Sequence, residues 1–348
     1  MRTRRLVVAL AVLACGLPLP LRGADSPYRR RKEIAIGGEG GWDYLSVDAV
    51  GRRLYVSHAT KVVVVDIDKD AVVGEIAPAL GVHGIALAPD LGRGFVSNGR
   101  EATVSIVDLK TLKIVGTVKT GENPDAILYE PGHKEVYAFN GRGKSATVFD
   151  AQTGDVRATI PLPGKPEFAV VDEGAGRIYN NIEDTSQLVA IDTNTHAVVA
   201  TWPIAPGEEA SGLAFDPEGR RLFVGCSNSL MLMVDATSGK VLASVPIGAG
   251  VDANAFDPGT GLAFASSSDG TLTVARPEGH DKLAVVQALA TPKRSRTMTL
   301  DPKTHRLYVA AAEFAPPTTG PDGKPQRPQV VPGSFKVVVY EMGGSPTR

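Results

Sequence analysis

Residues 212–225 read Gly-Leu-Ala-Phe-Asp-Pro-Glu-Gly-Arg-Arg-Leu-Phe-Val-Gly, and residues 230–245 continue, after a polar loop, as Leu-Met-Leu-Met-Val-Asp-Ala-Thr-Ser-Gly-Lys-Val-Leu-Ala-Ser-Val. Variants of this unit recur along the chain, and each has an acidic residue where its first apolar run ends. These residues are Asp48, Asp90, Glu130, Asp172, Asp216, Asp257 and Asp301. They are spaced by 40 to 44 residues. Repeats of this length, with four short apolar runs each, are typical of β-propeller blades.

Each unit is expected to form four strands. In the first unit the strands are predicted at residues 44–48, 53–57, 61–66 and 72–77. Valine, isoleucine and leucine dominate the third run of most units. Such runs are typical of strands that are buried on both faces, as they are when blades stack against one another.

The seventh unit lacks a fourth strand of its own. Its three runs lie at 297–301, 306–311 and 335–341, and the N-terminal segment 31–37 resembles the missing one. We therefore predict an all-β, seven-bladed β-propeller of four-stranded blades, closed by the N-terminal strand, which completes the last blade. This closure would remove two exposed sheet edges.

The repeated acidic residues tempt an interpretation as a catalytic or metal-binding array. However, Asp216-Pro-Glu-Gly and Asp301-Pro-Lys-Thr are turn sequences, in which the aspartate accepts hydrogen bonds from the backbone that follows it. A residue that every blade needs serves the blade. We therefore expect function to lie where the units differ.

The chain begins with a basic segment, residues 1–5, followed by the apolar run 6–14. This pattern indicates a secretory signal peptide, predicted over residues 1–24, with one propeller domain over 25–348. Processing has two alternatives: simple cleavage after Ala24, which we favour, or lipidation of Cys15 in a lipobox-like sequence. Either way we expect an exported protein, periplasmic or extracellular, with a possible lipid anchor and no transmembrane segment.

Charge and cysteine content narrow the classes of function. Without residues 1–24 the chain loses four arginines and keeps 33 basic against 38 acidic residues, a net charge of −5. A mildly acidic chain lacks the basic footprint of nucleic-acid binding, which is therefore not favoured. Only Cys226 would remain, so no internal disulfide is expected, and the fold must hold by burial. We expect a monomer.

Two patterns carry a resemblance to a known family. Segments of the Arg-Leu-Tyr-Val type occur at 51–56, 219–224 and 301–309, and Val-Asp hairpins occur at 107–111 and 234–238. They resemble the YVTN/YncE family of bacterial seven-bladed β-propellers over residues of about 30 to 343. The resemblance implies an exported propeller, and most family members have no assigned activity. Related propellers include lactonase-like enzymes and domains of redox proteins.

The sixth unit departs from the pattern. Residues 275–277 read Ala-Arg-Pro where an aspartate is expected, so we interpret this unit as a degenerate blade, with recruitment of Arg276 as the alternative.

Candidate functional residues lie at the entrances to the first strands and in the loops between second and third strands, which share the face around the channel mouth. The candidates for ligand binding there are Asp43, His58, His83, Asp125, Glu167, Asp252, Arg296, Asn98 and Asn140. His58 and His83 lie in adjacent units with Asp43 between them, a set that suits a divalent metal with open positions. The alternative is a solvated channel mouth.

A long loop interrupts the seventh unit. Residues 314–333 contain six prolines, and a loop of this length is usually a functional lid or a disordered segment. Its position between the second and third strands places it over the channel mouth. A surface excursion without a role is the alternative.

Motif absences weigh against several enzyme classes. The sequence has no Gly-x-Ser-x-Gly, His-Glu-x-x-His, Walker or Cys-x-x-Cys-His motif. We therefore expect a scaffold that binds a small molecule or protein partner at the channel mouth, without catalysis. A lactonase-like or metal-assisted hydrolase using the same face is the alternative. A second alternative is an accessory protein of a periplasmic redox pathway.

Overall fold

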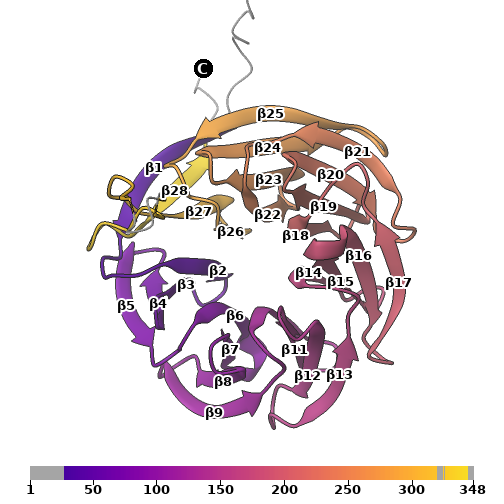
Figure 1. The fold of residues 1–348 in the computed structure, drawn as a ribbon, viewed down its shortest axis with the longest axis horizontal. Helices are drawn as coiled ribbons and strands as arrows, with labels where there is room; N and C mark the ends of the chain where they lie inside the picture. Colours follow the sequence, from indigo (N-terminus) through magenta and orange to yellow (C-terminus); the bar gives the residue numbers. More distant parts are fainter. Residues whose placement is uncertain (1–26, 320–323, 325, 344–348) are drawn as a thin grey trace, which may run out of the picture.

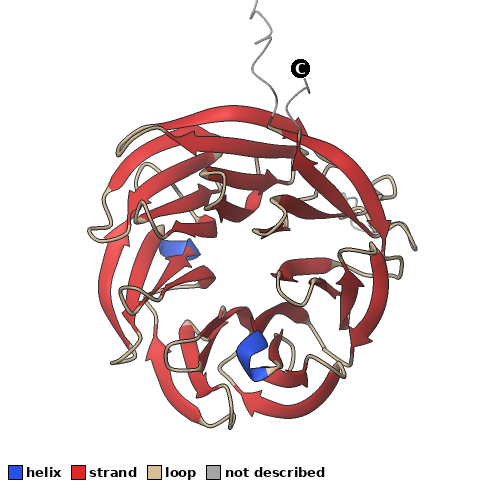
Figure 2. Ribbon diagram, turned by 180° about the vertical axis from the view of Figure 1, so that it is seen from behind, coloured by secondary structure: helices blue, strands red, loops and turns tan. Residues whose placement is uncertain are grey.

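The computed structural model describes residues 27–319, 324 and 326–343. The predicted signal peptide at 1–24 and Cys15 lie outside these residues. Seven four-stranded antiparallel sheets stand as blades around a central axis (Figure 1). Figure 2 shows strands joined by loops and turns, with helix confined to two short helical turns, η1 (Pro89–Leu91) and η2 (Glu183–Thr185). The predicted seven-bladed propeller is confirmed.

Strands are called a to d from the axis outward. The a strands are β2 (Trp42–Asp48), β6 (Val82–Ala88), β10 (Pro124–Glu130), β14 (Pro166–Asp172), β18 (Ala210–Asp216), β22 (Val251–Asp257) and β26 (Met298–Asp301). The b strands are β3 (Arg53–His58), β7 (Arg93–Asn98), β11 (Glu135–Asn140), β15 (Arg177–Ile182), β19 (Arg221–Cys226), β23 (Leu262–Ser267) and β27 (Arg306–Ala311).

The outer half of each blade is built in the same way. The c strands are β4 (Lys61–Asp66), β8 (Thr103–Asp108), β12 (Ser145–Asp150), β16 (Gln187–Asp192), β20 (Leu230–Asp235), β24 (Thr271–Pro277) and β28 (Lys336–Met342). The d strands are β5 (Ala71–Ile76), β9 (Lys113–Lys119), β13 (Val156–Pro161), β17 (Ala197–Pro203), β21 (Val241–Pro246), β25 (Leu283–Ala290) and β1 (Tyr28–Ala35).

The N-terminal strand closes the ring. β1 pairs antiparallel with β28, from Tyr28 opposite Met342 to Ala35 opposite Lys336, and completes the sheet β1-β28-β27-β26. It begins three residues earlier than the predicted segment 31–37. The last blade is therefore made from both ends of the propeller domain, and β1 covers the edge of β28 that would otherwise be unpaired.

Blade six is complete rather than degenerate. β24 continues through Arg276 to Pro277, and Arg276 pairs with Ala284 in β25. The absence of the usual aspartate lengthens this hairpin, because no side chain ends the c strand by bonding the turn backbone.

The repeated acidic residues form turns, as their sequence context predicted. Asp48 Oδ1, for example, accepts hydrogen bonds from the backbone N–H groups of Val50 and Gly51, at 3.1 and 2.7 Å. Blade two is an exception. Ala88, opposite Arg93, takes the register position of the repeated acid, and Asp90 lies in η1. The second acid of the repeat was therefore misplaced by two residues.

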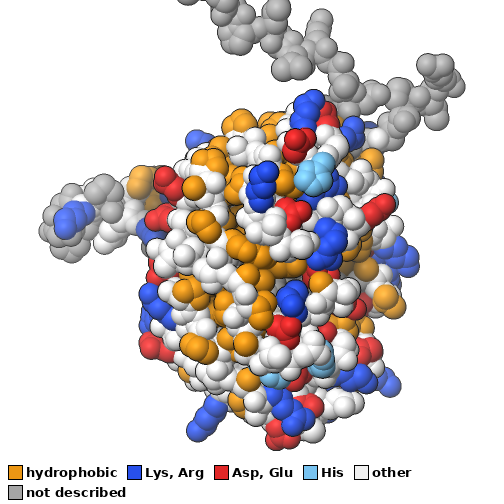
Figure 3. Space-filling model, turned by 90° about the vertical axis from the view of Figure 1, so that its right-hand side faces the viewer, with side chains coloured by type: hydrophobic (Ala, Val, Ile, Leu, Met, Phe, Trp, Pro, Cys, Tyr) orange, Lys and Arg blue, Asp and Glu red, His pale blue; other side chains and the backbone are white. Residues whose placement is uncertain are grey.

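Burial between blades holds the structure together. The b and c strands are buried on both faces, and each hydrophobic cluster joins neighbouring blades. Figure 3 shows the outer rim, where hydrophobic and charged side chains are interspersed. Cys226 is buried and forms no disulfide within the described residues. In that same part of the chain, no helix has the length and apolarity needed to cross a membrane.

Candidate functional site at the channel mouth

A β-bulge recurs near the start of the a strands. In β2 the pairing moves from Trp42 opposite His58 to Leu45 opposite Val56, so that Asp43 and Tyr44 have no partner on strand b. β6, β10, β14 and β18 have the same irregularity, and in β22 the shift leaves only Asp252 without a partner. Bulges turn side chains away from the sheet's regular alternation, and here they release side chains into the mouth of the channel.

The first residue of each bulge belongs to a ring of seven equivalent positions, which we call the mouth ring. The pairing of β26 with β27 contains no bulge, and the equivalent position of blade seven lies five residues before Asp301, just as Asp43 lies five before Asp48. The mouth ring consists of Asp43, His83, Asp125, Glu167, Ser211, Asp252 and Arg296. The structure thus brings together six of the nine predicted site residues and adds Ser211.

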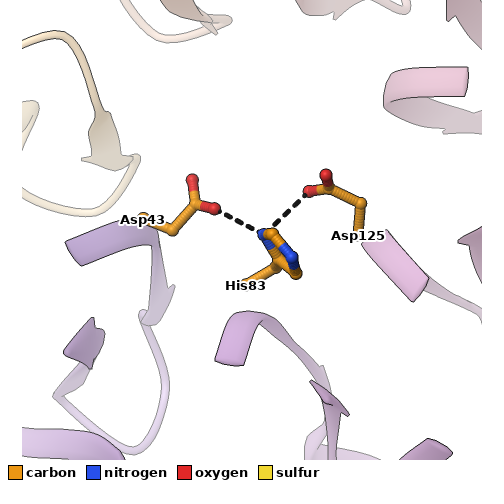
Figure 4. A group of neighbouring side chains, drawn as sticks. All are labelled: Asp43, His83 and Asp125. Carbon is orange, nitrogen blue, oxygen red and sulfur yellow. Dashed lines mark hydrogen bonds and ion pairs between the residues drawn. The ribbon is translucent and has the colours of Figure 1, made fainter. Parts of the chain in front are cut away.

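Three members of the mouth ring, from three successive blades, form a compact group (Figure 4). Nδ1 of His83 lies 2.7 Å from Oδ2 of Asp43 and 3.4 Å from Oδ1 of Asp125. All three potential ligand atoms lie within 4.8 Å of one another. One imidazole nitrogen and two carboxylate oxygens converging in this way match the ligand set of a divalent metal site.

The far side of the His83 ring is also fixed. The side chain of Asn123 hydrogen-bonds His83. Gly99 makes room for this contact, because a Cβ at that position would lie 2.6 Å from Nε2 of His83 and 2.9 Å from Oδ1 of Asn123. A metal-binding histidine usually donates the N–H of its other ring nitrogen to a carbonyl, a carboxylate or a water molecule. This arrangement leaves Nδ1 directed at the two carboxylates.

The remaining ring members pair among themselves or with a neighbour. Nε of Arg296 lies 3.2 Å from Oδ2 of Asp252, and the Ser211 hydroxyl donates to Oδ1 of Asp252 at 3.1 Å. Nζ of Lys165 lies 2.6 Å from Oε1 of Glu167. The ring and Lys165 therefore combine four carboxyl groups with three basic side chains, and negative charge is in excess when His83 is neutral.

This crowding perturbs the ionisation of the ring. Burial, together with the charge of Asp125, raises the pKa of Glu167 to about 8. Burial also raises the pKa of Asp125 to about 6, although His83 opposes the shift. For His83, burial favours the neutral form, but the hydrogen bond to Asp43 and the charges of Asp125 and Asp43 raise its pKa to about 9. A cation bound beside Asp43 and Asp125 would favour the charged forms of both carboxyl groups.

Two aromatic rings form the floor of the mouth. Tyr44 and Phe168 follow the mouth ring by one residue in opposite blades, and their ring centroids are 4.6 Å apart. The equivalent residues in the other blades are small: Gly84, Ala126, Gly212, Ala253 and Thr297. A Cβ at Gly84 would already lie 3.4 Å from Tyr44. The Tyr44 side chain also hydrogen-bonds Asp125, so the floor supports one of the three converging side chains.

The group is reached from a surface cavity. A cavity of about 500 Å³ is lined by Asp43 and His83, and also by Asn123, Arg100 and Arg142. The volume falls within the range of small-molecule sites. The wall of this cavity therefore combines one carboxylate and one imidazole of the group with two arginines.

His58 does not join this group, contrary to the predicted metal set of His58, His83 and Asp43. It is 1% exposed and stacks on Phe335, with ring centroids 4.3 Å apart. Burial lowers its pKa. His58 is the last residue of β3 and faces the interior of the blade. Asp125, and not His58, is the third member of the group with Asp43 and His83.

Asn98 and Asn140 also lie away from the mouth ring. They occupy the same position as His58 at the ends of β7 and β11, and both are buried. The Asn98 amide donates to the Ser105 hydroxyl at 2.9 Å, and the Asn140 amide donates to the Thr147 hydroxyl at 3.0 Å. They tie strand b to strand c within their own blades.

Asn123 and Tyr44 were missed by the sequence interpretation. Asn123 lies one residue before β10, at the same strand entrance that pointed to Asp125. Its left-handed backbone, with φ of 56°, sets it apart from an ordinary strand residue. Tyr44 directly follows Asp43, and the small residues at equivalent positions were the available signal for its role.

The proline-rich loop forms an arm, residues 314–333, of which the structure describes 314–319, 324 and 326–333. Phe314 and Val330 form a β-bridge at its base. Its described residues line a second cavity together with Trp42 and Arg296. The arm therefore lies beside the mouth ring.

Comparisons with known proteins agree on the fold. A family model described as the anaphase-promoting complex subunit 4 WD40 domain matches residues 181–256. No curated protein matches the chain. A solved structure, the Kuenenia stuttgartiensis hydrazine synthase, has a TM-score of 0.70 and 17% sequence identity, covering 78% of this chain and 92% of that chain. At this identity the likeness shows the fold alone.

The matched segment covers blade five and parts of blades four and six, which is less than half of the chain. The finer resemblance to the YVTN/YncE family therefore stays a prediction. What the structure and the matched segment establish together is coarser: the chain is a seven-bladed β-propeller with a WD40-type repeat match over residues 181–256.

Proposed function

We propose that the protein is a binding scaffold whose channel mouth holds a divalent transition-metal ion. The observation that carries the proposal is the convergence of Asp43, His83 and Asp125 on one point, from three rigid strands. Sites built on strands hold ligand atoms more closely than sites on loops. The ion would lie at the base of the 500 Å³ cavity, open to a further ligand.

The donor set favours some metals over others. One imidazole with two carboxylates suits Zn²⁺ or Mn²⁺, whereas Ca²⁺ takes oxygen ligands only, usually six to eight of them. Three protein ligands leave at least one coordination position for water or for a bound molecule. The closeness of Asp43 and Asp125 supports the same conclusion, because an ion that displaces the proton of His83 would compensate both carboxylates.

Titration of the purified protein with Zn²⁺, Mn²⁺ and Ca²⁺ by calorimetry tests the proposal. We expect one equivalent of Zn²⁺ or Mn²⁺ to bind and Ca²⁺ to bind much more weakly. His83→Ala and Asp125→Asn should each weaken binding by at least about 100-fold, and Asn123→Ala by about 10- to 100-fold. The exposed His280 provides a matched control, and His280→Ala should bind as the parent does.

The metal proposal fails if no ion binds stoichiometrically, or if His280→Ala loses as much affinity as His83→Ala. Retention of full affinity by His58→Ala is a further expected result, because His58 lies away from the group. Loss of binding in His58→Ala alone would instead support the metal set of His58, His83 and Asp43 that the sequence predicted.

A metal-assisted hydrolase is the second candidate, supported by Glu167. A carboxyl group with a pKa of about 8 beside a metal site can act as a general acid or base near neutral pH. Turnover of a simple lactone that disappears in both Glu167→Gln and His83→Ala would favour the enzyme. A metal-bound protein without turnover favours the scaffold.

We further propose that the protein acts outside the cytoplasm, as the basic and apolar segment at 1–14 suggests. A role in a periplasmic redox pathway has no support beyond fold-level likeness to hydrazine synthase, and it stays a prediction.

A further inference from the structure

A second cavity lies beside the mouth ring, against the arm. Its volume is about 630 Å³, within the range of small-molecule sites. Trp42, Arg294, Phe314 and Arg327 line it, together with Arg296 of the mouth ring. It shares none of the three proposed metal ligands.

Backbone hydrogen bonds hold the arm in place. The N–H of Val331 donates to the carbonyl of Glu313, and the N–H of Ala315 donates to the carbonyl of Gln329, both at 2.9 Å. The N–H of Gly333 donates to the carbonyl of Gly38, also at 2.9 Å, which fastens the arm to the N-terminal segment. The arm thus carries Phe314 and Arg327 to the cavity on a defined backbone.

The cavity concentrates positive charge that the described acidic side chains neutralise only in part. Of its three arginines, Arg296 alone has an ion pair within the described residues, a single contact from Nε to Asp252. The Arg294 guanidinium lies over the Phe314 ring, 4.8 Å from its centroid, and neither it nor Arg327 pairs with a described carboxylate. Guanidinium groups without an acid partner at a cavity wall suit a carboxylate or phosphate, which they can bind through two hydrogen bonds.

The backbone of Arg294 is fixed in an uncommon conformation. Its backbone has φ of 68°, in the left-handed region that arginine rarely adopts. A hydrogen bond from its N–H to the carbonyl of Ser268 fixes this conformation. Gly81, Asn123, Glu209 and Gly250 have positive φ at the equivalent position of their own blades, so this conformation belongs to the entry turn of the repeat. It gives the Arg294 side chain a defined starting point beside the cavity.

The apolar part of the wall is aromatic. The rings of Trp42 and Phe314 are tilted by 50° with centroids 6.0 Å apart, and Trp42 stacks on the buried Phe335. A rigid pair of rings beside guanidinium groups fits a flat molecule with an anionic end. A polyanion is disfavoured, because Asp43 and Asp252 stand next to the cavity in the mouth ring.

From these contacts we infer that the cavity between the arm and Trp42 binds a small aromatic anion, a flat ring carrying a carboxylate or a phosphate. Arg294 and Arg327 hold the anionic group, and Trp42 with Phe314 contacts the ring. This binding goes beyond the proposed metal function and does not depend on it.

Fluorescence of Trp42 provides a direct test. The sequence has two tryptophans, so a Trp202→Phe background leaves Trp42 as the reporter. The probes are benzoate and phenyl phosphate, with neutral benzamide as the matched control. We expect both anions, or one of them, to change the emission saturably, and benzamide to bind at least tenfold more weakly. Binding of only one anion identifies the preferred group.

Arg294→Gln and Arg327→Gln should each weaken anion binding by tenfold or more and leave Zn²⁺ or Mn²⁺ binding unchanged. Arg327 is exposed on the arm, so its replacement keeps the test valid if Arg294→Gln misfolds. Arg142→Gln, an exposed arginine at the other cavity, is the control and should bind normally. No saturable binding, unchanged binding in Arg327→Gln, or equal loss in Arg142→Gln would overturn the inference.

Discussion

The His83 side chain is protonated at neutral pH in the metal-free protein, because its pKa is raised to about 9 by Asp43 and Asp125. A metal ion must displace this proton to bind Nδ1. We therefore predict that affinity for Mn²⁺ rises about tenfold for each pH unit between about pH 6 and 8. Calorimetry at pH 7 in buffers of different ionisation enthalpy should detect about one proton released per ion.

The same shift has a consequence for stability without metal. A histidine whose folded pKa of about 9 exceeds its ordinary value of 6.5 stabilises the fold fully below pH 6.5, and this contribution is lost as the pH rises through 9. The parent should therefore lose its advantage over His83→Ala across this interval in urea denaturation. Metal affinity that is constant from pH 6 to 8 would place the ion away from His83.

At the scale of single residues, the sequence identifies Asp43, His83 and Asp125 as binding candidates, because the repeat aligns the strand entrances and the residue at this position varies among the blades. It does not place His58. That residue ends strand b, where the equivalent Asn98, Asn140 and Cys226 are all buried. The ring that covers His58 belongs to Phe335, far along the chain in the closing blade. Only the three-dimensional closure of the propeller brings these two residues together.

At the scale of elements, the a–b turns connect neighbouring blades. The residue four positions after the repeated acid has positive φ in every blade, and it is Gly92, Gly176 and Gly261 in three of them. In three others a long side chain reaches an acid of the preceding blade. These pairs are Arg52–Asp301 at 2.8 Å, Arg220–Asp172 at 2.7 Å and His305–Asp257 at 2.8 Å. These ion pairs between blades offset the free-energy cost of the left-handed backbone conformation.

Arg52→Gly separates the two effects. Glycine removes the left-handed strain of Arg52, worth about 1 kcal/mol, but leaves the fully buried Asp301 without its cation. We predict a net loss of about 2 kcal/mol in the free energy of unfolding, measured by urea denaturation.

Lys134→Gly is the matched control for this turn. Lys134 has the same left-handed backbone, but the acid position of the preceding blade is Ala88, and no ion pair of Lys134 occurs among the described residues. Its replacement should be neutral or stabilising by up to about 1 kcal/mol. A shift of both variants in the same direction would show that the ion pair contributes little.

For the whole molecule, the period of the repeat was sufficient to predict seven blades and the closing strand. The period fixes the number of strands, and the missing strand d of the last unit can be supplied only by the segment before the first. What it does not reveal are contacts that cross the axis or join distant blades. Tyr44 meets Phe168 across the channel, and the arm meets Trp42 of blade one, because these contacts exist only after the ring has closed.

The closing strand β1 joins two blade interfaces. Tyr28, at its start, packs in a cluster with Phe264 of blade six, and its hydroxyl donates to the carbonyl of His305. Near its end, Ile34 is 3% exposed, in a cluster that includes Val56 of blade one. Loosening β1 therefore opens the ring at both sides of blade seven and exposes the edge of β28.

Ile34→Asp tests whether the propeller unfolds as one closed unit. Burying a charge between Val56, Phe335 and their neighbours should cost about 4 kcal/mol, whereas Ala35→Asp, at an exposed position of the same strand, should cost less than about 0.5 kcal/mol. Because a freed β28 edge can pair with another chain, we also expect Ile34→Asp to associate at high concentration, measured by light scattering. If Ile34→Asp retained the parent's stability and remained monomeric, the ring would not depend on β1 for its closure.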